Sequence, residues 1–235
     1  LNKISKVSEN DYIKKLQPVY NSLKITKMKK ELQDKDLIGF VGAPWTILVY
    51  MLHKKSPKDG NFKKHLSDKI FVNELLEIII KFLKIHIDNQ IKSGATIIQI
   101  FDSWAGLLNE EDLENYVYKP TNNLVNFIKS KKIPSICFPK DIKNYKKYVA
   151  LVKPNVVSID YNVNPIEIAN TIDITVQGGL NPNLLLGNKE ELKRNTLKYL
   201  DIFKDKPYIF NLGHGVLPNT DPSMVDYLVK LIKNY

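Results

Sequence analysis

The sequence is almost free of cysteine. Cys137 is the only one among 235 residues. A single thiol excludes an internal disulfide and leaves no thiolate cluster for structural zinc. Cys137 lies in the apolar stretch S-I-C-F, which is typical of a buried core side chain rather than of a reactive nucleophile.

Arginine is equally scarce, since Arg194 is the only one, although the formal net charge is +10. Base readout and bidentate phosphate contacts favour arginine over lysine. The lysines are spread along every predicted helix rather than gathered in one stripe with aromatic residues, so we expect no nucleic-acid partner. A positive field of this kind still concentrates acidic small molecules.

Long apolar runs are also missing. The closest approach, residues 75–85, is interrupted by Glu77 and Lys81, and the first residues lack the apolar core of a secretory signal. We therefore expect no membrane association. The 43% hydrophobic content is nevertheless enough for a substantial core.

The apolar pattern predicts alternating strands and helices. Six short apolar runs are predicted to be buried strands, at residues 37–41, 96–101, 135–138, 156–160, 174–177 and 208–212. Amphipathic periodicity predicts helices at about residues 10–33, 45–53, 72–93, 110–131, 144–152 and 222–234, the first opened by a capping-box pattern at Ser8. Residues 54–61 are predicted to form a loop.

Buried strands separated by amphipathic helices predict an α/β fold with a parallel sheet covered on both faces. A doubly wound sheet would normally carry a glycine-rich G-x-G-x-x-G turn after its first strand, and the sequence has none. The alternative is a (β/α)8 TIM barrel, which needs eight strands. About six strand–helix units are visible, so a barrel would be incomplete in this chain, with its first strand or two upstream of Leu1 or in a less obvious N-terminal segment.

Polar residues and glycines cluster directly after the predicted strands. G-A-P-W-T, D-S-W-A-G, P-K-D, D-Y-N, G-G-L-N-P and G-H-G follow the six strands in that order. The carboxyl ends of the strands carry the active site in barrels of this class, so we expect the functional site there. His214 lies between two glycines in the last of these turns; it is either a solvated turn residue or a group that contacts an anion or moves a proton.

These motifs, in order and with similar spacing, resemble the uroporphyrinogen decarboxylase family. The resemblance rests on G-F-V-G-A-P-W-T-I-L-V-Y-M, Q-I-F-D-S-W-A-G, V-V-S-I-D, V-Q-G-G-L-N-P and F-N-L-G-H-G-V-L-P-N-T-D-P, and it runs from about residue 38 to the C-terminus. It implies that residues 1–235 form one barrel domain that is truncated at its N-terminus. It also implies an enzyme that converts uroporphyrinogen III to coproporphyrinogen III by removing four acetate carboxylates.

The resemblance implies four substrate-binding residues, and each also has a purely structural interpretation. Tyr50 is expected to donate a hydrogen bond to a substrate carboxylate, or else to pack within its helix. Ser103 is expected to hold a carboxylate, or else to cap a turn. His214 is expected to contact a propionate arm, and Phe101 either packs against the macrocycle or ends its strand.

The family's catalytic aspartate and its anion-binding arginines have no counterpart here. In the family they lie upstream of the segment matched by G-A-P-W, and the resemblance places the aspartate upstream of Leu1. No catalytic residue is therefore identified in this chain, and the chain alone is expected to be inactive. Smaller departures are Gly179, Asn181 and the Tyr161–Asn162 pair, where the family tends to have other residues.

The resemblance further implies that no cofactor and no metal take part, that the protein forms a homodimer, and that it works in the cytoplasm or a plastid. Two alternatives stay open at this point. One is a catalytically silent binding module on the same barrel. The other is a methyltransferase of the same superfamily, for which the single cysteine and the scattered His53, His65 and His86 supply no evident zinc ligand set.

Overall fold

The computed structural model describes residues 6–53, 66 and 68–235, in two compact units. The first unit comprises residues 1–142 and 150–154, and the second comprises residues 143–149 and 155–235. The loop predicted at residues 54–61 lies outside the described residues, as does His65. Leu1, upstream of which the catalytic aspartate is expected, also lies outside them, so the placement of that aspartate stays a prediction.

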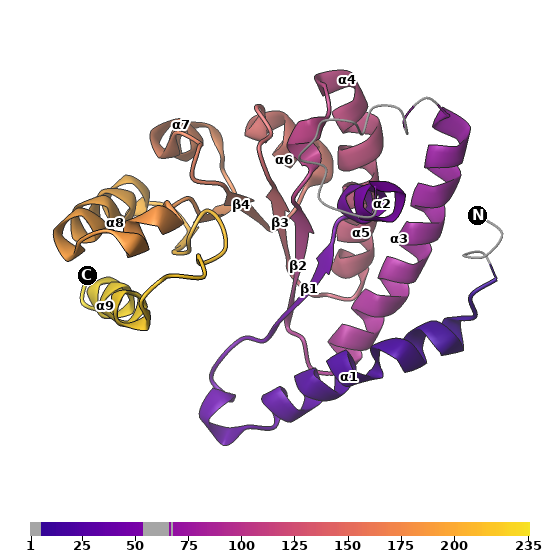
Figure 1. Ribbon diagram of the computed structural model, residues 1–235, viewed down its shortest axis with the longest axis horizontal. Coiled ribbons are helices and arrows are strands. Elements are labelled where there is room, and N and C mark those ends of the chain that lie inside the picture. The colour runs from indigo at the N-terminus through magenta and orange to yellow at the C-terminus, as the bar shows by residue number, and fades with distance from the viewer. Residues whose placement is uncertain (1–5, 54–65, 67) are drawn as a thin grey trace. The chain divides into compact units, whose positions relative to one another are not determined.

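The first unit contains three parallel strands in sequence order (Figure 1). They are β1 (Ile38–Gly42), β2 (Ile97–Asp102) and β3 (Ser135–Pro139), with Ile100 of β2 opposite Val41 and Cys137. Side chains alternate between the two faces of a strand. One face, which includes Val41, Ile98, Ile100 and Cys137, is at most 3% exposed, and the other presents the rings of Phe40, Phe101 and Phe138.

Three long helices accompany this sheet, namely α1 (Glu9–Lys27), α2 (Pro44–His53) and α3 (Lys69–Lys92). The Ser8 side chain accepts the amide hydrogen of Asp11, which confirms the predicted helix start. The helix ends at Lys27 rather than near residue 33, and a short 3₁₀ helix, η1 (Lys30–Leu32), follows. Tyr20 Oη lies 3.0 Å from His86 Nδ1 and so links α1 to α3.

The predicted helix at residues 110–131 is divided into three parts. After the 3₁₀ turn η3 (Ala105–Leu107) come α4 (Glu110–Leu113), the π-helical turn η4 (Glu114–Tyr118) and α5 (Lys119–Ser130). Pro120 has no amide hydrogen to donate four residues back, and the amide of Lys119 bonds five residues back to Glu114. The wider turn accommodates the proline without ending the helical run.

The second unit also alternates strands and helices along the chain. It contains the parallel strands β4 (Val156–Ile159), β5 (Thr175–Gly178) and β6 (Tyr208–Ile209), together with α7 (Pro165–Thr171), η5 (Pro182–Leu186), α8 (Lys189–Phe203) and α9 (Pro222–Lys233). Helix α6 (Tyr145–Val152) spans the boundary between the units. Within this unit α8 and α9 lie side by side (Figure 1).

Strand β6 is shorter than predicted. The prediction was 208–212, but regular pairing ends at Ile209, and Leu212 returns in a single parallel bridge to Leu180. Gly178 and Gly179, at the end of β5, have φ of +85° and +99°. This left-handed backbone turns the chain out of the regular ladder, so the pairing cannot continue without a break.

The strand and helix order confirms the predicted α/β fold of the (β/α) barrel type. Closure into eight strands stays a prediction. Among the described residues, none of the helices combines the length and the apolar character needed to cross a membrane.

Candidate active site

The turn after β1 positions helix α2 at the carboxyl end of β2. The amide of Ala43 donates to the Phe101 carbonyl at 2.8 Å, which extends the parallel ladder one residue beyond β1. Helix α2 begins at the next residue, Pro44, whose fixed φ suits a first helical position. As a result, Trp45 and Thr46 reach the turn that follows β2.

Two consecutive side chains of α2 hold the main chain of Trp104. The Trp45 indole Nε1 donates to the Trp104 carbonyl at 2.9 Å, and the Trp104 amide donates to Thr46 Oγ1 at 3.3 Å. Thr46 Oγ1 in turn donates to Asp102 Oδ1 at 2.6 Å. The turn formed by residues 102–104 is therefore fixed through the peptide units on both sides of the Trp104 α-carbon.

Asp102 is a buried carboxyl group. Its side chain is 1% exposed, and its Oδ2 has no hydrogen-bond partner among the described residues. Burial raises the pKa of the Asp102 carboxyl to about 7, although the hydrogen bonds from Thr46 and the Trp104 amide act in the opposite direction. The group therefore exchanges its proton near neutral pH.

Tyr50 and the Ser103 turn lie together. The Tyr50 side chain is 47% exposed, and its ring meets the Trp104 ring edge-on, with centroids 6.1 Å apart. Ser103, directly before Trp104, is half-buried. Tyr50 thus contacts the residue that follows Ser103, at the carboxyl end of β2.

Phe101 lies on the opposite face of β2 from Asp102, because successive side chains alternate. Its ring packs edge-on against Phe40 and Phe138, at centroid distances of 6.0 and 6.2 Å. Phe40 is 64% exposed. These three rings form an aromatic cluster on this face of the sheet, and Phe40 is its most exposed member.

The turn after β3 is hydrogen-bonded to the turn after β2. The Lys140 amide donates to the Asp102 carbonyl at 3.0 Å, and the Gly106 amide donates to the Lys140 carbonyl at 3.1 Å. The Lys140 side chain forms an ion pair with Asp141. The P-K-D and D-S-W-A-G turns therefore form one connected loop cluster.

The second unit holds a separate set of predicted residues around Asp160. Asp160 is 1% exposed; it accepts a hydrogen bond from Tyr145 Oη at 3.2 Å and one from the Asn162 amide at 2.9 Å. Gly213 packs directly onto this turn, because a Cβ added to it would lie 2.5 Å from the Tyr161 nitrogen. Only glycine permits this approach.

His214 follows this anchored glycine. The Gly213 amide donates to the Leu180 carbonyl at 2.7 Å, which fixes the backbone on one side of the histidine. The His214 side chain is exposed, and a Cβ on the next residue, Gly215, would meet nothing within 4 Å. The histidine is therefore held by backbone contacts, while its ring stays accessible. Its convergence with Tyr50 and Ser103 stays a prediction.

Sequence reasoning assigned no role to Thr46, Asp102, Trp104 or Asp160. Two of these followed a visible signal, because Asp102 and Asp160 each come directly after an apolar strand. The partners of Asp102 gave no such signal, since Thr46 lies 56 residues earlier. Within the described part of the chain, no group of three or more His, Cys, Asp or Glu side chains is placed to hold a metal ion.

Similar folds occur in two solved structures. A methyltransferase from Methanosarcina mazei matches with a TM-score of 0.74 and 17% identity over 92% of this chain and 63% of that chain. A B12-independent methionine synthase from Shewanella sp. W3-18-1 matches with a TM-score of 0.57 and 15% identity over 92% of this chain and 66% of that chain. At these identities the likeness supports the fold alone.

Two relatives with higher identity share one name. A Rickettsia bellii protein named uroporphyrinogen decarboxylase is 43% identical over 229 residues, and an Orientia tsutsugamushi protein of the same name is 39% identical over 229 residues. Each alignment covers 94% of this chain and 66% of the relative, so the chain spans slightly less than two thirds of their length. The family model for uroporphyrinogen decarboxylase matches residues 1–235. With that match over its whole length, the chain belongs to the uroporphyrinogen decarboxylase family.

Proposed function

We propose that this chain is the larger part of a uroporphyrinogen decarboxylase, a carboxy-lyase that removes the four acetate carboxylates of uroporphyrinogen III. The single observation that carries this proposal, beyond family membership, is the contact between Tyr50 and Trp104. In this contact the Tyr50 ring lies against Trp104, the residue that follows Ser103, which supports a shared role for the Tyr50 and Ser103 hydroxyl groups. Both groups suit the recognition of carboxylates.

The reaction does not need a cofactor, because the substrate supplies its own electron sink. Protonation of a pyrrole ring at carbon makes it cationic. When the bond to the acetate carboxylate breaks, carbon dioxide leaves and its electron pair moves into the ring. A proton then adds to the remaining methylene carbon to give a methyl group, and loss of the ring proton restores the pyrrole. The protein has to orient the substrate, stabilise the positive ring and exclude water.

We assign the first unit to binding and orientation. The Tyr50 hydroxyl and the Ser103 hydroxyl would donate hydrogen bonds to substrate carboxylates, while Phe101 would lie against the macrocycle. The rigid Trp104 main chain supports this assignment, because a donor held in place loses little entropy when it binds.

We assign the second unit to an additional carboxylate contact. His214 would donate to a propionate or acetate arm from the turn anchored by Gly213. The net charge of +10 supports an acidic substrate, since a positive field raises the rate of encounter with a polycarboxylate.

The group that stabilises the cationic pyrrole is, by this proposal, not among the residues of this chain. The family's aspartate motif has no counterpart between Leu1 and Tyr235, and Asp102 cannot substitute for it because its carboxyl is buried on the helix side of β2. The activity would therefore depend on a segment that corresponds to the unmatched third of the relatives. We further propose a homodimer that works in the cytoplasm.

The test is anaerobic conversion of uroporphyrinogen by two proteins. One is this chain, and the other is a chimera in which the unmatched part of the Rickettsia bellii relative precedes it. We expect the chimera to release coproporphyrinogen, with the loss of carboxylates followed by chromatography, and the chain alone to be slower by about 10²–10³-fold or more. The chimera should keep its rate with a chelator present.

Two results would contradict the proposal. Turnover by the chain alone at the rate of the chimera would mean that the catalytic centre has been misplaced. Inhibition of the chimera by the chelator would favour the metal-dependent methyltransferases of similar fold instead.

A further inference from the structure

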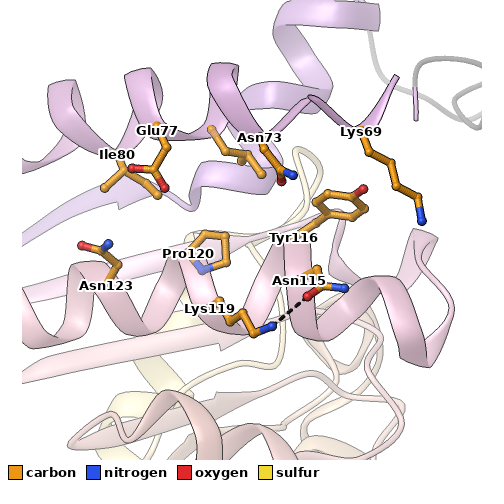
Figure 2. A pocket seen from close by; sticks show the side chains of 10 residues that line it. Lys69, Asn73, Glu77, Ile80, Asn115, Tyr116, Lys119, Pro120 and Asn123 are labelled. Atoms are coloured by element: carbon orange, nitrogen blue, oxygen red, sulfur yellow. Dashed lines mark hydrogen bonds between the residues drawn. The ribbon is translucent and has the colours of Figure 1, made fainter. Parts of the chain in front are cut away.

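A polar pocket lies in the first unit, and its lining includes no residue of the loop cluster at the strand ends. It occupies about 450 Å³ between α3 and the run formed by η4 and α5 (Figure 2). Its lining residues are Lys69, Asn73, Leu76, Glu77, Ile80, Asn115, Tyr116, Lys119, Pro120 and Asn123. Tyr50, Phe101 and Ser103 do not line it. Its volume is within the range of about 300–1,000 Å³ that small-molecule sites occupy.

Tyr116 is the residue that distinguishes this pocket from an ordinary groove between helices. The residue is only 4% exposed, and its ring stacks on Trp45 with centroids 5.9 Å apart. Its hydroxyl points into the pocket (Figure 2) and has no hydrogen-bond partner among the described residues. The hydroxyl itself is accessible from the pocket, so it is free to donate a hydrogen bond to a bound acceptor.

The π-helical turn explains why Tyr116 is there. Residues 114–118 form η4, which re-aligns the helix before Pro120. π-Helical turns are rare and often occur at functional sites. Burial, and to a smaller extent the Asp112 carboxylate, raise the pKa of the Tyr116 hydroxyl, so it stays a hydrogen-bond donor at neutral pH.

The two ends of the pocket differ in charge. Helices α3 and α5 run in the same direction along it, so their early residues lie at one end and their later residues at the other (Figure 2). The early end has the ammonium groups of Lys69 and Lys119, and Lys119 Nζ also lies 2.9 Å from Asn115 Oδ1 and 3.9 Å from Glu114. This end offers N–H and O–H donors to an anion.

The later end has Glu77 and Asn123, and the pocket floor between the ends is formed by Leu76, Ile80 and Pro120. A carboxylate and amides accept hydrogen bonds from hydroxyl groups, and an apolar floor suits the C–H face of a sugar ring. An anion without hydroxyl groups would have no donors for the Glu77 carboxylate and the Asn123 amide oxygen.

We propose that this pocket binds a small polyhydroxylated anion, by class a sugar phosphate or a sugar acid. Its anionic group lies at the Lys69 end beside the Tyr116 hydroxyl, and its hydroxyl groups lie at the Glu77 end. A sugar phosphate and a sugar acid both combine an anionic group with hydroxyl groups. The test therefore uses one probe of each kind to tell them apart.

The test is calorimetric titration of the full chain with four probes: glucose 6-phosphate, glucuronate, glucose and inorganic phosphate. One of the two sugar anions is expected to bind at least tenfold more tightly than glucose and than inorganic phosphate. Tyr116→Phe removes only the hydroxyl and should weaken that binding by about tenfold or more, since hydrogen bonds to charged groups are strong. Lys69→Met should have a similar effect, while Lys129→Met, an exposed lysine of α5 outside the pocket, should change it less than twofold.

A spectroscopic measurement locates the bound molecule. The chain has two tryptophans, and Trp45 stacks on Tyr116. The indole N–H resonance of Trp45, assigned with Trp104→Phe, should therefore shift on saturation. Absence of binding by both sugar anions, binding that Tyr116→Phe leaves unchanged, equal affinity for inorganic phosphate, or saturation without a Trp45 shift would each overturn the proposal.

Discussion

The Thr46 hydroxyl donates to the buried Asp102 carboxyl at 2.6 Å, and this bond joins the first turn of α2 to the end of β2. The same oxygen accepts the Trp104 amide hydrogen, so one hydroxyl orders both the acid and the turn that follows it. The predicted substrate-binding residues Tyr50 and Ser103 are on either side of this link. The positions of Tyr50 and Ser103 therefore depend on the buried side chains of Thr46 and Asp102.

Removing the Thr46 hydroxyl should destabilise the fold. Thr46→Val keeps the shape of the side chain but leaves Asp102 without its donor, and we expect a loss of about 1–3 kcal/mol in the free energy of unfolding. Thr46→Ser keeps the hydroxyl and should lose less than half as much. Urea unfolding measures both, and equal losses would show that the methyl group rather than the hydrogen bond is what matters.

Asp102 should make stability depend on pH. Its pKa is about 7 when folded against an ordinary value of 3.8, so the folded state binds more protons than the unfolded state between these values. Stability then falls as pH rises from about 4 to about 7, by up to about 1.4 kcal/mol per pH unit. Unfolding of Asp102→Asn over the same range should lack this slope.

An exposed carboxylate provides the control for that experiment. Asp226 pairs with Lys230 on the surface of α9, and its side chain is 61% exposed. Asp226→Asn should keep the slope of the parent chain, because surface pairs contribute little. If Asp102→Asn also kept the slope, another group would have to be its source.

Gly213 should not tolerate a side chain. Gly213→Ala would place a Cβ 2.5 Å from the Tyr161 nitrogen, and the turn that carries His214 would have to move. We expect a loss of about 1–3 kcal/mol, as for other overpacked sites. Gly215→Ala is the matched control, since nothing lies within 4 Å of its added Cβ. Equal stability of the two variants would contradict the described contact.

The elements of the fold could be predicted because their signals are local. The six apolar runs end in turn residues, and each is found as a strand within a few residues of its predicted bounds. The exceptions have physical causes that lie outside those runs. Pro120 imposes a π-helical turn on a continuous helical pattern, and two left-handed glycines shorten the pairing of β6.

The candidate site was predictable only in part. Motifs suggested Tyr50 and Ser103, and their role as site residues stays a prediction, although the parallel order of β1 and β2 explains the contact between Tyr50 and Trp104. The role of Asp102 could not be identified, because strand alternation directs its side chain toward α2, where only the fold reveals Thr46 as its partner. The Tyr116 pocket was missed for the same reason, since its lining comes from helices about 40 residues apart in sequence.

The central claim is that Tyr50, Ser103 and His214 bind carboxylates of one tetrapyrrole, and kcat/KM of the chimera described above tests it most directly. We predict that Tyr50→Phe, Ser103→Ala and His214→Leu each lower kcat/KM for uroporphyrinogen by about 10–100-fold, as expected when a hydrogen bond to a charged group is lost. Ser130→Ala, an exposed serine at the end of α5, should leave kcat/KM within twofold of the parent. Three variants that all match the Ser130→Ala control would contradict the account.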